Sequence, residues 1–126
     1  MKTKLFVILI IFAGILSSCS SGKSASGKMY DRSAHASYYA TKFNGRKTAS
    51  GEIFSNSRYT AAHRKIPFGT KLRITNLANK KSVVVEVNDR GPFSRGRDID
   101  LSKKAFMEIA DTKNDGALKV SIEVLK

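Results

Sequence analysis

The sequence predicts a mainly β fold, a small six-stranded barrel that carries one short helix. Short segments in which apolar and polar residues alternate recur from about Ala34 to the end of the chain, as expected for half-buried strands. Gly, Ser, Asn and Pro separate these segments, as they do in turns. Many short strands and little helix favour a closed barrel, because closure leaves no exposed sheet edge.

The expected strands are read from this alternation. They lie at residues 35–40, 59–63, 71–77, 82–89 and 117–125, with a short one around Ile99. In the third of these, Leu72, Ile74 and Asn76 point to one side, and "ANKK" then turns the chain back to form a hairpin. Residues 44–56 are rich in Gly, Ser and Asn, which predicts a long loop.

One helix is predicted, over "KKAFMEIA" (103–110). Ser102 precedes it and can cap its first turn through the side-chain oxygen. Ala105, Phe106 and Ile109 lie at helical spacing on one stripe, which predicts that this face packs on the barrel.

The first residues differ from the rest and predict an export signal. Lys2 and Lys4 precede an apolar run that ends in small residues before Cys19, and this run is too short to span a bilayer comfortably. We expect a lipoprotein signal peptide at 1–18, an acylated Cys19 with a flexible tether over 19–33, and the barrel over 34–126. An uncleaved anchor segment and a free thiol available for pairing are the alternatives.

The chain is strongly basic, with a formal net charge of +13, of which +11 remains once Lys2 and Lys4 are removed. Such a surface attracts polyanions. An exported, membrane-anchored protein meets phospholipid head groups, lipopolysaccharide and cell-wall carboxylates, so we expect these rather than nucleic acid. Nothing in the sequence indicates an oligomer, and we expect a monomer in the cell envelope, with the outer membrane favoured over the inner.

The motifs carry a resemblance to a known family. "ASYYA", "NGRKTASGE", "TAAHRKIPFGTKLRITN" and "VNDRGPFSRGRDIDLSKKA" occur in the order and spacing of the rare lipoprotein A (RlpA) family. The resemblance implies a double-psi β-barrel and an endolytic transglycosylase that cleaves peptidoglycan strands, preferably those stripped of stem peptides. The resemblance also implies that Glu52, His63 and Asp89 are associated with the activity. Many members also carry a C-terminal SPOR domain, which we do not expect here because the sequence stops at Lys126.

Asp89 is the predicted acid. A lytic transglycosylase needs one carboxyl that protonates the leaving oxygen and then accepts the proton of the attacking 6-hydroxyl. For this Asp89 needs a pKa well above about 3.9, which burial against Pro92, Phe93 and a sugar would supply, whereas Arg90 would lower it if it pointed at the carboxylate. Alternatively, Asp89 is a turn residue that accepts the N–H of Gly91.

The supporting residues have alternatives too. Glu52 would orient the 6-hydroxyl, stabilise positive charge or serve as the second carboxylate of an inverting hydrolase, or it faces solvent in its loop. His63 would form a hydrogen bond to Asp89 or to the sugar. Alternatively, it is a buried or surface imidazole with no role in the reaction. Tyr38 and Tyr39 are adjacent on a strand, so one should face outward for sugar stacking, unless they serve as core and lid.

The predicted substrate-binding residues are Tyr39, Arg64, Arg90 and Arg97. The last three belong to a basic cluster around the motifs that also contains Arg46, Lys47 and Arg95, which we expect to favour anionic, peptide-free glycan. Asp98 and Asp100 should bond the Arg-Gly loop or cap the helix. His35 and His63 show no metal-binding spacing and there are no cysteine pairs, so neither metal nor cofactor is expected. A non-catalytic, expansin-like glycan-binding module is the alternative function.

Overall fold

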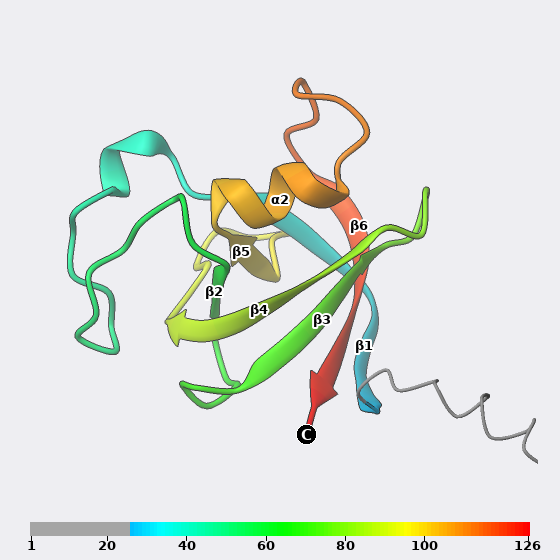
Figure 1. Cartoon of the computed structure of the whole chain (residues 1–126), viewed down its shortest axis with the longest axis horizontal. Helices are drawn as coiled ribbons and strands as arrows, with labels where there is room; N and C mark the ends of the chain where they lie inside the picture. The colour runs from blue at the N-terminus through cyan, green and yellow to red at the C-terminus, as the bar shows by residue number, and fades with distance from the viewer. Residues whose placement is uncertain (1–25) are drawn as a thin grey trace, which may run out of the picture.

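A computed structural model describes residues 26–126 of the chain, so the predicted signal peptide, Cys19 and the rest of the predicted tether up to residue 25 lie outside the described residues. The described part is a closed barrel of six strands in the order β1-β5-β2-β4-β3-β6, with one helix, α2, packed across it (Figure 1). The elements are β1 (Gly27–Tyr38), β2 (Thr60–His63), β3 (Lys71–Asn76), β4 (Ser82–Asp89), β5 (Ile99–Leu101), α2 (Lys103–Ile109) and β6 (Leu118–Leu125).

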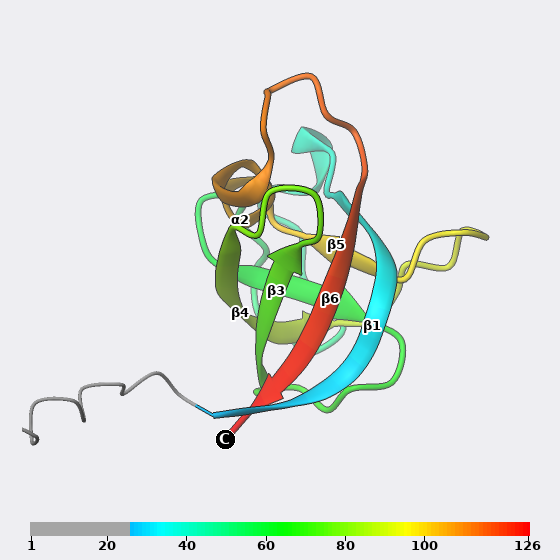
Figure 2. The same ribbon diagram turned by 90° about the vertical axis from the view of Figure 1, so that its right-hand side faces the viewer.

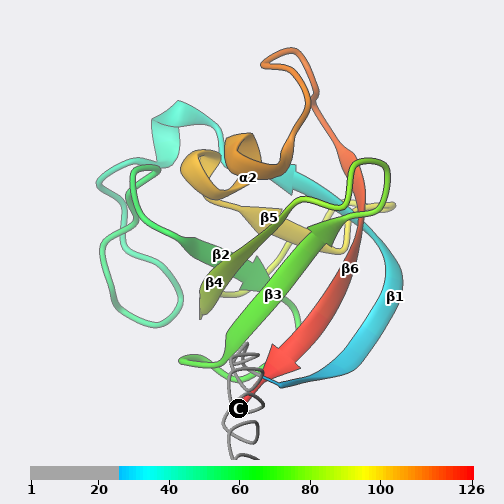
Figure 3. The ribbon, with the colours of Figure 1, turned by 45° about the vertical axis from the view of Figure 1, so that its right-hand side comes forward.

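Two parallel strand pairs distinguish this barrel from a simple meander. β1 runs parallel to β5, and β2 runs parallel to β4, whereas the other neighbouring strands are antiparallel. Figure 3 shows β3, β4 and β6 side by side on one side of the barrel. The predicted fold class is therefore confirmed, and so is the hairpin of β3 and β4, which pairs Leu72 with Val85 and Ile74 with Val83.

The core follows the predicted alternation. Leu72, Ile74 and Asn76 are buried on one side of β3, and Val120 and Ile122 of β6 are fully buried. In α2 the buried residues are Ala105, Phe106 and Ile109, and the Ser102 side chain accepts a hydrogen bond from the amide of Ala105, as the sequence predicts.

The first strand is longer than the sequence indicates. It begins at Gly27, not at His35, so the tether predicted to extend to residue 33 overlaps β1. Gly27 pairs with Leu125 and Ala34 with Val120, so the first half of β1 is held by backbone pairing to β6. Residues 27–30 are exposed, and they carry no apolar alternation by which the sequence could reveal a strand. Figure 2 shows most of β1 lying beside β6.

The residues between β1 and β2 form the predicted long loop. A single 3-10 turn, η1 (Thr41–Phe43), opens it, and an isolated bridge between Lys47 and Ile53 closes it on itself. Phe54 is buried in a small second core with Tyr39 and Ala62. This second core fixes the loop against the barrel at the end where β4 finishes.

Candidate active site

Asp89 is the last residue of β4, and three donors hold its carboxylate. Oδ1 accepts hydrogen bonds from the backbone amides of Ala49 (2.8 Å) and Arg90 (2.9 Å), and Oδ2 accepts one from the hydroxyl of Tyr39 (2.7 Å). Two of these donors are distant in sequence, in the 44–56 loop and just after β1. The carboxylate therefore ties three segments together, and its bonds differ from the Gly91 contact of the turn alternative.

Tyr39 positions this carboxylate. Its ring stacks on Phe54 with centroids 4.0 Å apart and meets Phe43 edge-on, and only 9% of the residue is exposed. Burial, and then the hydrogen bond to Asp89, raise the pKa of the Tyr39 hydroxyl far above its usual range. The hydroxyl therefore remains a donor at any physiological pH. Because so little of the Tyr39 ring is exposed, it is poorly placed for the expected stacking on a sugar.

Asp89 lies in an open hollow of about 480 Å³, which we call the central hollow. Its walls come from the end of β1, from η1, and from the loop after β4, and its lining includes Tyr38, Lys42, Phe43, Pro92, Phe93, Ser94, Arg97 and Asp100. Phe93 is 81% exposed at its rim. A hollow of this size with aromatic rims and the carboxylates of Asp89 and Asp100 suits a saccharide, because sugar rings present apolar faces and polar edges.

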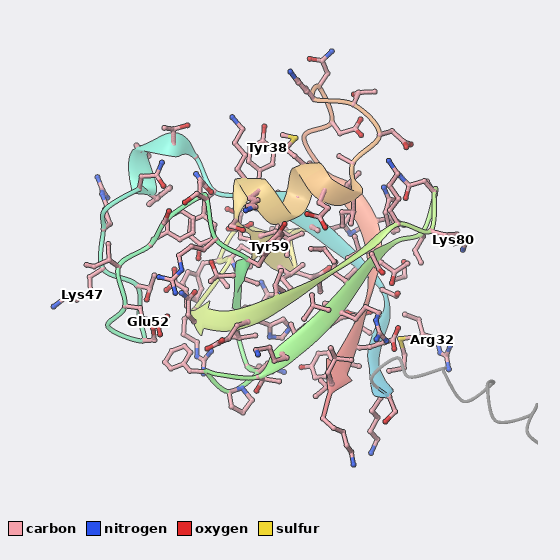
Figure 4. The ribbon with its side chains drawn as sticks, viewed as in Figure 1. Arg32, Tyr38, Lys47, Glu52, Tyr59 and Lys80 are labelled. Atoms are coloured by element: carbon pink, nitrogen blue, oxygen red, sulfur yellow. The ribbon has the colours of Figure 1, made fainter. Side chains whose placement is uncertain are left out.

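Glu52 lies beside the central hollow and does not line it. It is exposed on the 44–56 loop, where Figure 4 shows it near the end of β4. Its Oε1 accepts a hydrogen bond from the side-chain amide of Asn88 (3.0 Å), and the same loop bonds the Asn88 carbonyl through the amide of Ser50 (3.3 Å). Glu52 is thus linked to the residue before Asp89, and a sequence search for acids alone misses this connecting role of Asn88.

His63 faces away from Asp89. It ends β2, where Ala62 is the residue that pairs with Asp89, so strand alternation directs His63 to the other side. Its Nδ1 accepts the backbone N–H groups of Lys65 (3.0 Å) and Ile66 (3.2 Å). Within residues 26–126 no hydrogen bond joins His63 to Asp89, so the expected contact between the two is not formed.

The surroundings of His63 favour its neutral form. It opens onto a separate small hollow with Tyr30, Asp31, Arg64, Lys65 and Asp98. Burial, and then the nearby charges of Arg64 and Arg90, lower the pKa of His63, while Asp98 and Asp31 act weakly in the opposite direction. A neutral imidazole is what its Nδ1 needs in order to accept two hydrogen bonds.

The guanidinium groups of three predicted substrate-binding residues bond to the protein itself. Arg90 donates to the carbonyls of His63 (3.3 Å) and Ile66 (2.9 Å) and stacks over Phe68 at 4.0 Å, so it points to the adjoining loop. Arg64 donates to the carbonyls of Pro92 and Arg97 and pairs with Asp98. Arg97 donates to both oxygens of Asp100 (2.9 and 2.7 Å). These bonds brace the loops on either side of the central hollow.

The two aspartates near β5 have the predicted structural role. Asp100 accepts bonds from Arg97 and from the hydroxyl of Ser37 (2.7 Å), and Asp98 accepts the amide of His35 (2.8 Å). The bond from Arg97 joins Asp100 to the Arg-Gly loop, as expected from the sequence.

Two features are absent from the described residues. No helix in the 26–126 region is both long enough and apolar enough to cross a membrane. In the same region no three His, Cys, Asp or Glu side chains gather in an arrangement that would hold a metal ion.

Comparison with known proteins identifies the class first. Residues 31–122 match the family model described as "Lytic transglycolase". The chain is 53% identical over 98 residues to the probable endolytic peptidoglycan transglycosylase RlpA of Treponema pallidum, covering 78% of this chain and 30% of that protein. It is 48% identical over 99 residues to the endolytic peptidoglycan transglycosylase RlpA of Pasteurella multocida, covering 79% and 33%. The chain therefore belongs to the RlpA family of lytic transglycolases, and it spans about a third of the length of these relatives.

Solved structures share the fold. The Streptomyces papain inhibitor has a TM-score of 0.61 at 20% identity, over 77% of this chain and 96% of that one. An expansin from Clavibacter michiganensis also has a TM-score of 0.61, at 21% identity, over 77% of this chain and 51% of that one. At such low identity these similarities establish the barrel fold only.

Proposed function

We propose that this protein is a peptidoglycan lytic transglycosylase in which Asp89 is the acid and base. It cleaves the MurNAc–GlcNAc β-1,4 bond of glycan strands, preferably strands without stem peptides, and forms 1,6-anhydro ends. The observation that carries this proposal is the carboxylate of Asp89, which donors from three segments hold in the central hollow. Relatives named as endolytic peptidoglycan transglycosylases support it.

The hydrogen bonds of Asp89 indicate which of its oxygens transfers the proton. Oδ1 already accepts two N–H groups, which occupy both of its lone pairs. Oδ2 accepts only the Tyr39 hydroxyl and keeps one lone pair for a proton. In the proposed reaction Oδ2–H protonates the departing O4 of GlcNAc as the C1–O4 bond breaks. The 6-hydroxyl of the same MurNAc then bonds to C1 and returns its proton to Oδ2.

One carboxyl is sufficient for this chemistry because the nucleophile belongs to the substrate. An inverting hydrolase needs a second free carboxylate about 6.5–9.5 Å away to activate water. Asp100 lines the central hollow, but Arg97 and Ser37 occupy its oxygens, and Glu52 lies outside the lining. We therefore favour the anhydro-forming reaction, with Glu52 acting at the edge of the site.

His63 is proposed to act through the backbone. It holds the turn at residues 64–66, whose carbonyl at Ile66 binds the guanidinium of Arg90, and the amide of Arg90 donates to Asp89. His63 is then a positioning residue, because it stabilises the segment that holds the carboxylate without lining the central hollow.

We place the enzyme in the cell envelope, where peptidoglycan lies. Acylation of Cys19 would attach the barrel to a membrane, with the outer membrane facing the periplasm favoured and a monomer expected. Metabolic labelling with a palmitate analogue, compared between the parent and Cys19→Ser, tests the anchor, and retention of the label in the variant would exclude it.

Mass spectrometry of peptide-free glycan tests the reaction. We expect the parent to produce 1,6-anhydro ends and Asp89→Asn to produce none while still binding the strands. Reducing ends with added water would indicate a hydrolase instead. Binding without any cleavage by the parent would indicate the expansin-like binding module.

A further inference from the structure

We propose that the central hollow is the middle of a longer groove, and that unpaired cations in two flanking hollows bind the lactyl carboxylates of a peptide-free glycan strand. One flanking hollow is formed by α2 and the loop after it, and the other is formed by the loop at residues 93–98. This inference rests on the proposed function and specifies which residues select the substrate.

The first flanking hollow adjoins the central hollow at Tyr38. Tyr38 lines both, and beyond it the helix-side hollow, of about 450 Å³, is lined by Lys103, Met107, Thr112 and Lys113 among others. Tyr38 packs on Phe106 of α2 and is half-buried, so it forms a fixed ridge between the two hollows. Figure 4 shows Tyr38 next to α2, on the same side as the loop that follows this helix.

The second flanking hollow adjoins the central hollow at a different wall. Phe93, Ser94 and Arg97 line both of them, and the loop-side hollow, of about 430 Å³, extends to Arg95 and Gly96. In Figure 2 the yellow loop that carries these residues projects from the side of the barrel, whereas the orange loop after α2 projects from its top. The shared walls place Asp89 in the middle hollow of three.

The charges of the flanking hollows are available to a ligand. Among residues 26–126, no carboxylate lies within ion-pair distance of Lys103, Lys113 or Arg95, and all three are exposed. The other arginines of the loop-side hollow, Arg64 and Arg97, are bound to loop carbonyls and to Asp98 and Asp100. The basic residues that bind an anionic substrate are therefore expected at the two ends of the groove.

Opposing charges are few in these hollows. Asp111 in the helix-side hollow accepts a bond from the side-chain amide of Asn79 (2.7 Å), and Asp98 in the loop-side hollow is paired with Arg64. The net charge of each flanking hollow therefore remains positive, which attracts a carboxylate-bearing ligand.

The chemistry of the substrate matches the presence of cations in both flanking hollows. In a peptide-free strand every MurNAc carries a free lactyl carboxylate, whereas a stem peptide converts that carboxylate into an amide. An enzyme that cuts within a strand must bind sugars on both sides of the broken bond, so cations on both sides of Asp89 favour naked strands. Stem peptides would remove the charges that these cations bind.

Binding measurements with the full chain test the inference. The protein carries Asp89→Asn so that strands are not consumed, and the ligands are MurNAc–GlcNAc oligosaccharides of increasing length. The same oligosaccharides with amidated lactyl groups are the matched ligand control. Lys71→Gln is the matched protein control, because Lys71 is exposed at the start of β3 and lines none of the three hollows.

We expect Lys103→Gln/Lys113→Gln and Arg95→Gln each to weaken binding of long naked strands about three-fold or more, as for exposed ion pairs. Short oligosaccharides, amidated strands and Lys71→Gln should show no such loss. Equal binding by parent and variants, or equal losses for naked and amidated strands, overturns the inference. If the inference fails but the protein with Asp89 intact still forms anhydro ends, the proposed function stands. If that protein neither binds nor cleaves naked strands, both the proposed function and this inference are overturned.

Discussion

Replacing His63 separates the two roles that a histidine at this position can have. In the first role, His63 transfers a proton and has to contact the substrate. In the second, His63 accepts the backbone N–H groups of the turn that follows β2, which requires only an unprotonated Nδ1. Asn places its Oδ1 close to where Nδ1 lies, but it cannot transfer a proton near neutral pH. Gln reaches one methylene further and Ala has no acceptor, so His63→Asn, His63→Gln and His63→Ala form a matched series.

The magnitude follows from the two hydrogen bonds to Nδ1. Loss of the acceptor leaves the amide of Ile66 buried without a partner, at about 1–3 kcal/mol, and loosens that of Lys65, at about 1 kcal/mol. His63→Ala should therefore lower the free energy of unfolding by about 3 kcal/mol, or roughly 10–20 °C in Tm for a domain of this size. His63→Asn keeps the acceptor and loses mainly the edge contact with Tyr30, about 1 kcal/mol.

The pH dependence of stability has a definite sign. The pKa of His63 is lowered in the folded protein, so the unfolded chain binds a proton first as the pH falls. Stability is then fully present above the unfolded pKa of about 6.5 and declines below it, until the folded state is protonated too. The other ionisable groups are common to both proteins, so the difference between the parent and His63→Asn isolates this contribution.

Thermal unfolding from pH 5 to 8 and cleavage of naked glycan at pH 7 provide the assays. We expect His63→Asn to keep activity within about three-fold of the parent, and His63→Ala and His63→Gln to lose both stability and activity. A folded His63→Asn protein whose cleavage rate falls by 100-fold or more would refute the turn-acceptor role, since that is the loss expected for a general acid or base.

Three further predictions concern Tyr39, Ser102 and the charge of the substrate. Tyr39→Phe removes the donor to Asp89 Oδ2 and keeps the stack on Phe54, so kcat should fall about ten-fold with KM unchanged, as steady-state kinetics would show. Ser102→Ala removes the α2 cap and a half-buried hydrogen bond to the Arg58 carbonyl, and should lower the free energy of unfolding by about 2 kcal/mol, as chemical denaturation would show. Raising NaCl from about 50 to 500 mM should weaken binding of naked strands far more than of amidated ones.

Alternation in the sequence predicted the parts of the fold that are half-buried. Leu72 and Ile74 in β3 and Val120 and Ile122 in β6 alternate with polar residues because one side of each strand faces the core. The first half of β1 gave no such signal, since its residues are mostly exposed and are held mainly by backbone pairing with β6, with one edge contact between Tyr30 and His63. Apolar alternation arises only where a strand buries side chains, so a strand that buries few of them leaves no such pattern.

The site was predictable at Asp89 and less so around it. The motif indicated a carboxylate at the end of a strand, which is where Asp89 lies. The direction of His63 depends on the parallel register of β2 and β4, in which Ala62 pairs with Asp89, and no local pattern encodes that register. The bonds of Arg64 and Arg90 to loop carbonyls are likewise tertiary contacts, so the sequence could count these charges but could not tell which were already bound.

The length of β1 sets a distance between the two ends of the molecule. Its 12 residues extend at most about 40 Å at 3.3 Å per residue, from Gly27 beside Leu125 to Tyr38 at the wall of the central hollow. If Cys19 carries a lipid, the barrel itself becomes a spacer that holds the cutting end away from the bilayer. Shortening the segment between Cys19 and Gly27 would then remove only part of the distance between the bilayer and the central hollow, because the length of β1 would remain.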